Sequence, residues 1–273
     1  MQDLRRKIYF DTDAWRRIGD ALSGGALSAE MRQRIVFSPI TLLELLSQLA
    51  LQKDKGQRVL GQVQSVYNCV DPTHREILPW PNVAIAHFGL RVTLKGDSFE
   101  AAGRNLNICM SAQDADEVQP GALKVMDALR QMKATTVGLS KQLVEVWRKG
   151  NPKPESFDEV WLSVLARGLG IDPSRFLAAD VAEALSAYHE FERQRLLVAA
   201  QDPMYNFEKS ANDILDAQQL VYLADSRLSF LTGDRGYLRR IKKSQQKTRI
   251  HLLGRRPLNT ADDVDAVLRA ILI

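Results

Sequence analysis

The segment I-Y-F-D-T-D, residues 8–13, decides how the fold is interpreted. Lys7–Phe10 is a short apolar run of the kind that forms a buried strand, and Asp11 follows it directly. The segment L-S-F-L-T-G-D, residues 228–234, repeats this arrangement and ends in Asp234. Open parallel sheets bind their ligands at the carboxyl edge of the strands. We therefore expect Asp11 and Asp234 to lie at that edge of one sheet.

Working outward from these segments, strand and helix patterns alternate at both ends of the chain. The expected strands are Lys7–Phe10, Arg34–Phe37, Leu228–Leu231 and Arg249–Leu253. The expected helices there are Ile40–Leu51, Ile214–Leu223, Gly236–Gln246 and Ala261–Leu272. Such alternation is typical of an α/β fold, in which a parallel sheet is flanked by helices.

The middle of the chain follows a different pattern. Residues 70–205 are rich in helical apolar spacing, as in Gly121–Trp147, Phe157–Ala166 and Phe176–Leu197. We therefore predict an α/β domain made of residues 1–69 and 206–273. Residues 70–205 would form a large helical insertion or cap on its sheet.

The composition is that of an ordinary globular protein. Of the 273 residues, 45% are apolar and 26% are charged, which excludes a disordered or low-complexity chain. Cys69 and Cys109 are too few for a disulfide-stapled scaffold, so we expect buried free thiols in a reducing compartment. The sequence has neither the ~20-residue apolar run of a membrane span nor a signal sequence. These features predict a cytoplasmic protein with no membrane partner.

The net charge of +4 comes from one short segment near the C-terminus. Nine basic residues and no acidic one lie between Arg235 and Arg256. That leaves 28 basic and 33 acidic residues, a net charge of −5, for the rest of the chain. A local basic stripe is typical of proteins that bind a polyanion such as nucleic acid. The alternative interpretation of this stripe is a solvated helix face.

Carboxylates dominate the remaining motifs. Glu44 lies within a leucine-rich helix, where burial would surround its charge with apolar side chains. Asp213 and Asp216 lie three residues apart, on one face of the expected helix and near its N-terminus. Converging carboxylates repel one another unless a cation lies between them, and Mg²⁺ or Mn²⁺ prefers such oxygen ligands. With Asp11 and Asp234, these acids predict a metal site that activates water for attack on a phosphodiester.

Four motifs, in this order, resemble those of the PIN domain, a family of metal-dependent nucleases that mostly act on RNA. They are I-Y-F-D-T-D (8–13), S-P-I-T-L-L-E-L-L (38–46), N-D-I-L-D-A-Q-Q-L-V-Y-L-A (212–224) and L-S-F-L-T-G-D (228–234). The resemblance implies a set of catalytic metal ligands: Asp11, Glu44, Asp216 and Asp234, with Asp213 as an added outer acid. It also implies that Thr12 and Thr232 support these ligands or bind phosphate. Residues 70–205 match nothing in the family.

The resemblance implies a Mg²⁺- or Mn²⁺-dependent endoribonuclease with a PIN-like fold. RNA would be its substrate, with single-stranded DNA as a second substrate to test. Because the family includes toxins of bacterial toxin–antitoxin pairs, an antitoxin or another protein would be a partner. The basic residues up to Arg249 would hold the RNA backbone, in particular Arg235, Arg239, Arg240, Lys242 and Lys243. The sequence leaves open whether the chain forms a homodimer.

Two other functions and two structural interpretations stay open from the sequence. D-T-D after a strand also resembles the nucleophile motif of haloacid-dehalogenase-type phosphohydrolases, although Ala14-Trp15 replaces the turn that is usual there. A degenerate PIN-like fold could instead be a catalytically inactive module that binds RNA or protein. Asp13 could cap the first helix, and Asp213 could form a capping box with Ser210.

Overall fold

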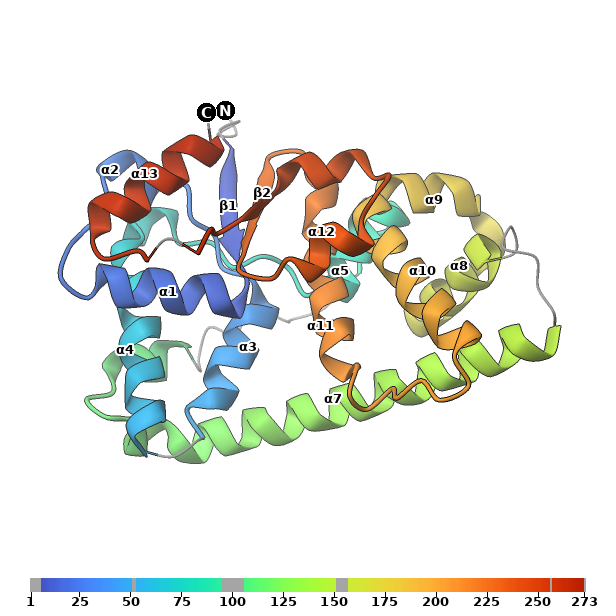
Figure 1. Ribbon diagram of the computed structural model, residues 1–273, viewed down its shortest axis with the longest axis horizontal. Coiled ribbons are helices and arrows are strands. Elements are labelled where there is room, and N and C mark those ends of the chain that lie inside the picture. The colour runs from blue at the N-terminus through green and yellow to red at the C-terminus, as the bar shows by residue number, and fades with distance from the viewer. Residues whose placement is uncertain (1–5, 51–52, 95–105, 151–156, 256, 273) are drawn as a thin grey trace.

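The computed structural model describes residues 6–50, 53–94, 106–150, 157–255 and 257–272. The fold is mixed α/β and mostly helical, and it is built around a small parallel sheet (Figure 1). The strands are β1 (Lys7–Phe10), β2 (Leu228–Thr232) and β3 (Ile250–Leu252), in the order β1-β2-β3. The parallel α/β sheet expected from the sequence is therefore confirmed.

Parallel pairing brings the two ends of the chain together. Phe10 of β1 lies beside Leu231 of β2, so that both strands end at the same edge of the sheet. Phe230 of β2 pairs in turn with Ile250 of β3. The expected strand Arg34–Phe37 forms only isolated bridges to its neighbours.

The sheet is covered on both faces, because the side chains of a strand alternate between them. Ile8 and Phe10 belong to one apolar cluster, whereas Tyr9 belongs to a second one. None of these three side chains is more than 1% exposed. Burial on both faces explains why the strands are almost continuously apolar.

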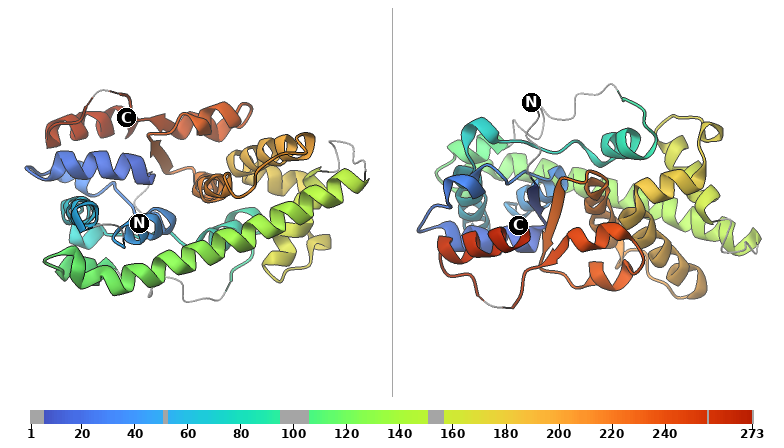
Figure 2. Two further views of the ribbon diagram at one scale, coloured as in Figure 1. Left: turned by 60° about the horizontal axis from the view of Figure 1, so that its bottom comes forward. Right: turned by 90° about the horizontal axis from the view of Figure 1, so that it is seen from above.

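The first face is covered by four helices: α1 (Thr12–Leu22), α3 (Pro39–Gln48), α4 (Lys53–Cys69) and α13 (Ala261–Leu272). Figure 2 shows α13, α1 and α4 stacked in successive layers. Trp15, Ile18 and Leu22 recur at helical spacing on α1 and are all buried. Helix α1 approaches α4 closely at Gly19, where a Cβ atom would lie only 2.7 Å from the carbonyl oxygen of Gln62.

The second face is covered by α8 (Phe157–Gly168), α9 (Ala178–Ala184), α10 (Ser186–Gln201) and α11 (Ala211–Gln219). The long helix α7 (Ala115–Gly150) runs along both groups of helices (Figure 1). Val118 and Val125, near its beginning, pack in the first cluster, and Val144, near its end, packs in the second. The helices between residues 70 and 205 thus contribute directly to the core around the sheet.

Shorter elements connect these parts. They are α2 (Ala29–Arg32), α5 (Pro81–Ala84), α12 (Gly236–Arg240), a π-helical turn (Ile85–Gly89) and the 3-10 turns Pro72–His74, Pro173–Arg175, Leu220–Ala224 and Gln245–Arg249. Within the described ranges, no helix combines the length and the apolar character needed to cross a membrane.

Four expected helices end early or are interrupted. Ile40–Leu51 ends at Gln48, and Ile214–Leu223 gives way to a 3-10 turn after Gln219. Tertiary hydrogen bonds explain the other two. The expected helix Phe176–Leu197 is broken between α9 and α10, where the side chain of Gln246 accepts a hydrogen bond from the N–H of Ala187 and donates one to the oxygen of Ala184. The expected basic helix Gly236–Gln246 ends at Arg240. Beyond it, the Glu190 carboxylate binds the backbone N–H groups of residues 242–244.

Candidate active site

Asp11 lies where β1 ends and α1 begins, and it is 8% exposed. Its carboxylate accepts hydrogen bonds from the N–H of Ala14 at 2.7 Å, from the N–H of Gly233 at 3.3 Å and from the hydroxyl of Thr232. Burial raises the pKa of Asp11 to about 6 in spite of these bonds. Asp11 caps α1, so the expectation that Asp13 caps this helix is wrong.

Glu44 reaches the same edge of the sheet from α3. Thr12 donates a hydrogen bond from its hydroxyl to the Glu44 carboxylate. One turn earlier on α3, the Thr41 hydroxyl donates to the carbonyl oxygen of Phe10 at 2.6 Å, which fixes the helix against the end of β1. Burial raises the pKa of Glu44, and the positive charge of Lys133 on α7 opposes this effect only in part.

Asp216 on α11 is surrounded by other carboxylates. Burial, followed by the charges of Glu44, Asp213 and Asp234, raises its pKa to about 7. The hydroxyl of Tyr237 on α12 donates a hydrogen bond to Asp216 at 3.0 Å. Four carboxylates from three of the sequence motifs are therefore close enough to act on one another.

Asp213 lies at the border of this group and has a cationic partner. The Arg240 guanidinium forms an ion pair with it at 2.8 Å and also lies over the ring of Phe191 on α10, 4.8 Å from its centre. The Ser210 side chain makes no capping hydrogen bond to α11, so the expected capping box is wrong. Asp213, near the N-terminus of α11, instead forms the ion pair with Arg240 that joins α11 to α12.

The turn after β2 is built around the hydroxyl of Thr232. This hydroxyl donates to Asp11 and accepts a hydrogen bond from the N–H of Asp234 at 2.9 Å. The Asp234 carboxylate accepts from the N–H of Gly236 at 2.7 Å, at the beginning of α12. Thr232 is buried and Asp234 is exposed. The two threonines singled out from the sequence, Thr12 and Thr232, thus each hold a carboxylate of the group.

The sequence interpretation missed two residues of this group, Asp13 and Tyr237. Asp13 packs against Gly233, where an added Cβ atom would lie 2.8 Å from the Cγ atom of Asp13. Its charge also contributes to the raised pKa of Asp11. The signal for Asp13 is its place in the first turn after the capping Asp11. The signal for Tyr237 is a buried aromatic residue three positions after Asp234.

Within the basic segment, the charged groups have different surroundings. Arg249 donates to backbone carbonyl oxygens of Leu223, Asp225 and Leu228, the last at 3.0 Å, and is half-buried. It therefore supports the edge of the sheet and does not belong to the basic surface. Arg239 is exposed on α12.

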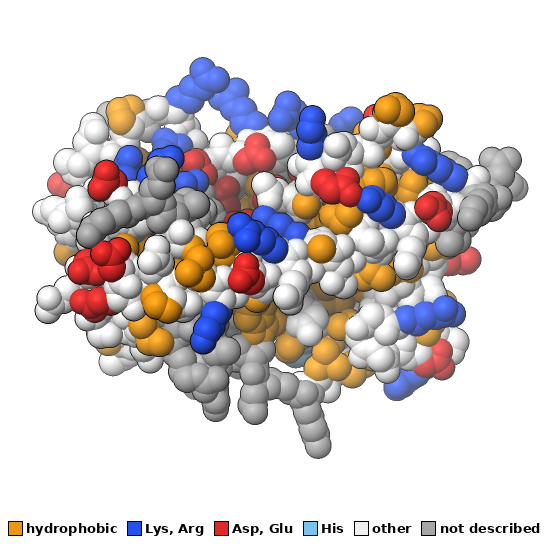
Figure 3. Space-filling model, turned by 90° about the horizontal axis from the view of Figure 1, so that it is seen from below, with side chains coloured by type: hydrophobic (Ala, Val, Ile, Leu, Met, Phe, Trp, Pro, Cys, Tyr) orange, Lys and Arg blue, Asp and Glu red, His pale blue; other side chains and the backbone are white. Residues whose placement is uncertain are grey.

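A hollow of about 340 Å³ adjoins the carboxylates described above, which we call the acidic group: Asp11, Asp13, Glu44, Asp213, Asp216 and Asp234. Arg17, Arg235 and Arg255 line it together with Gly233 and Asp234. On the side of the molecule along which α7 runs, by contrast, basic, acidic and apolar side chains are interspersed over the coloured surface (Figure 3). Three arginines thus line a hollow directly beside Asp234.

The donors of the acidic group suit a hard divalent cation. Carboxylate oxygens are the ligands that Mg²⁺ and Mn²⁺ prefer, and a cation near Glu44 and Asp216 would remove the repulsion between them. In the ranges that the structure describes, no three His, Cys, Asp or Glu side chains are arranged closely enough to hold a metal ion. The donor chemistry therefore fits a divalent cation, while the carboxylates are spaced more widely than the ligands of a bound ion.

Comparison with protein-family models, curated proteins and solved structures finds no match to this chain. The resemblance to PIN-domain nucleases therefore stays a prediction that rests on the four motifs.

Proposed function

We propose that this chain is a metal-dependent nuclease of the PIN type that cleaves RNA. The proposal is supported by one observation above all. Acids from four separate motifs gather at one edge of a parallel sheet, and burial raises the pKa of Asp11, Glu44 and Asp216. A buried group of like charges destabilises a protein unless it binds a cation, and such groups are typical of functional sites.

The roles of the residues follow from their contacts. The cation would be held by Asp11, Glu44, Asp216 and Asp234, with Asp213 at the border. When bound, Mg²⁺ or Mn²⁺ supplies an activated water and neutralises charge on the phosphodiester. Thr232 orients the Asp11 carboxylate, Thr12 orients that of Glu44 and Tyr237 orients that of Asp216. The arginine-lined hollow beside Asp234 offers hydrogen-bond donors to the phosphates of the substrate.

A phosphohydrolase of the haloacid-dehalogenase type would need Asp11 as a nucleophile. Both oxygens of this carboxylate accept hydrogen bonds, and the residue is 8% exposed. That environment favours a ligand or a positioning role over attack on phosphorus. In the nuclease interpretation Glu44 and Asp216 have a function as metal ligands, whereas a phosphohydrolase of this type would give them none.

The test is cleavage of a mixed set of fluorescent RNA and single-stranded DNA oligonucleotides with Mn²⁺ or Mg²⁺. We expect Asp216→Asn and Glu44→Gln to lower the cleavage rate at least ~100-fold, because several kcal/mol of charge stabilisation is lost. Asp127→Asn is the matched control, since Asp127 is exposed on α7 and pairs only with Arg130 among the described residues. Cleavage that survives both site substitutions would refute the site.

A second measurement is independent of activity. Mn²⁺ should raise the melting temperature of the wild-type protein and of Asp127→Asn, and it should do so much less for Asp216→Asn. If Mn²⁺ has no such effect, and no oligonucleotide is cleaved, the chain is an inactive binding module and the proposal is wrong.

A further inference from the structure

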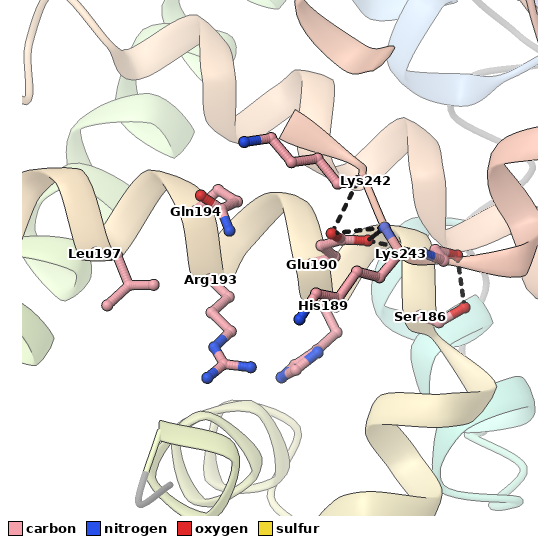
Figure 4. Close-up of a pocket in the computed structure, with 9 residues that line it drawn as sticks. Ser186, His189, Glu190, Arg193, Gln194, Leu197, Lys242 and Lys243 are labelled. Carbon is pink, nitrogen blue, oxygen red and sulfur yellow. Dashed lines mark hydrogen bonds between the residues drawn. The ribbon is translucent and has the colours of Figure 1, made fainter. Parts of the chain in front are cut away.

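A second hollow, of about 370 Å³, lies between α10 and the backbone of residues 242–244. Figure 4 shows the guanidinium of Arg193 and the ammonium of Lys243 on the same side of α10, with the ring of His189 next to them. The Lys242 side chain points to the other side. Hydrogen-bonded hydroxyls of Ser186 and Ser244, 2.7 Å apart, border the same hollow.

The acids at this hollow are already engaged. The Glu190 carboxylate accepts hydrogen bonds from the N–H groups of Lys242, Lys243 and Ser244 at 2.8–2.9 Å. Asp158 lies 2.8 Å from the Nε2 atom of His189. Burial lowers the pKa of His189, so the ring adds no positive charge at neutral pH. The positive charge in the hollow is therefore that of Arg193 and Lys243.

Within the described ranges, Arg193 and Lys243 take part in no ion pair. The Arg193 guanidinium lies over the ring of Phe157 instead, 5.9 Å from its centre. Arg193, Lys242 and Lys243 outnumber the single carboxylate of the lining, that of Glu190, so the hollow is net positive and attracts an anion. A guanidinium and an ammonium together suit a phosphate group in particular.

The chain connects this hollow to the acidic group. Arg240 pairs with Asp213 at the border of the carboxylates and also lies over Phe191 of α10. Lys243 is three residues further on, so the Cα atoms of Arg240 and Lys243 are at most about 11 Å apart. A polyanion bound at the carboxylates can therefore continue past Arg240 to the hollow.

We propose that this hollow binds an internal backbone phosphate of the RNA, away from the bond that is cleaved. The inference rests on the proposed function, and it gives α10 a part in substrate binding. Arg193 on α10 and Lys243 after α12 hold the phosphate, while the Glu190 carboxylate stays bound to the backbone N–H groups of residues 242–244. The contact lengthens the stretch of single strand that the protein recognises without reading its bases.

The test uses proteins that carry Asp216→Asn, so that RNA is bound and not cut. The binding of a fluorescent single-stranded RNA is measured between 50 and 200 mM salt. Adding Arg193→Ala and Lys243→Ala should weaken binding about tenfold and lower the slope of log K against log salt by about 0.7, because one phosphate contact is lost. The control pair is Arg130→Ala with Lys124→Ala, which removes the same charge from α7.

Three outcomes decide the question. An affinity and a slope equal to those of the control pair would overturn the phosphate site. A loss confined to RNA with a 5′-phosphate would overturn the assignment to an internal phosphate, because equal losses with and without that group are expected. The nuclease itself is tested separately by cleavage. If no RNA is cleaved but the double substitution still lowers affinity and slope, the proposed function fails and the phosphate site stands.

Discussion

Replacing Gly233 by alanine tests how closely the two strand ends approach each other. The new Cβ atom would overlap the Oδ2 atom of Asp13 and lie 2.8 Å from its Cγ atom and 3.2 Å from its Cβ atom. Carbon atoms in contact are ~3.5–4.0 Å apart, so Asp13 would have to move by roughly 1 Å. Asp13 follows Asp11 and Thr12 in the first turn of α1, and the displacement therefore reaches the residues that hold the carboxylates.

The two expected effects differ in size. A misplacement of about 1 Å in a catalytic group lowers the rate ~100-fold. The Asp13 carboxylate is exposed and can turn toward solvent, which leaves only the 3.2 Å contact between the two Cβ atoms to be relieved by the backbone. The loss of stability should therefore stay at the low end of the ~1–3 kcal/mol that overpacking costs. We therefore expect kcat/KM for RNA cleavage to fall about 100-fold, with little change in the melting temperature.

The assay compares cleavage and thermal unfolding of Gly233→Ala with those of Gly24→Ala. Gly24 is a suitable control because an added Cβ atom there has no neighbour within 4 Å. In an Asp13→Ala protein the overlap is removed, and Gly233→Ala should then cost little further activity. Wild-type activity in Gly233→Ala would refute the argument, and so would an undiminished loss in the Asp13→Ala background.

Three further predictions follow from the packing and the charges. Gly19→Ala should destabilise the protein by about 1–3 kcal/mol in urea unfolding, because the Cβ atom meets the immobile backbone of Gln62; an unchanged midpoint would contradict this. Arg249→Ala should also lower stability, since it removes hydrogen bonds to three backbone carbonyl oxygens, yet the salt slope of RNA binding should not change. The third concerns pH. Asp216 has a pKa of about 7 in the folded protein and an ordinary value of 3.8, so the folded state holds its proton more tightly. Its contribution to stability is fully present below about pH 4 and is lost as the pH rises through 7. Urea unfolding without added metal should accordingly show lower stability at pH 8 than at pH 5.5, and Asp216→Asn should reduce the difference.

Local patterns in the sequence were sufficient to predict the strands of the sheet and many of the helices around it. An apolar run followed by an acid marks a buried strand and the edge of the sheet at which it ends, which is how Asp11 and Asp234 are placed. The last helix, Ala261–Leu272, has the expected bounds because its apolar spacing is regular. The gathering of Glu44 and Asp216 near Asp234 follows from the topology of a parallel sheet.

Contacts between distant segments could not be foreseen in the same way. The break after α9 depends on the side chain of Gln246, and the end of α12 depends on Glu190, which binds the N–H groups that a longer helix would use. Charge counting grouped Arg249 with the RNA-binding residues, although it faces backbone carbonyl groups. The role of Asp13 depends on the absence of a side chain at Gly233, which no helical pattern reveals.

The pairing of β1 with β2 has a consequence for protein synthesis. Asp11 and Thr232 are 221 residues apart, and the loop that joins their strands costs only about 5 kcal/mol of closure entropy, because this cost grows with the logarithm of length. The more important effect is one of timing, because a ribosome delivers Asp11 and Glu44 long before Asp216 and Asp234. A growing chain would carry half of the carboxylates and lack the strand that aligns them. On the proposed function, the growing chain could not cleave RNA until the last strands and helices have emerged.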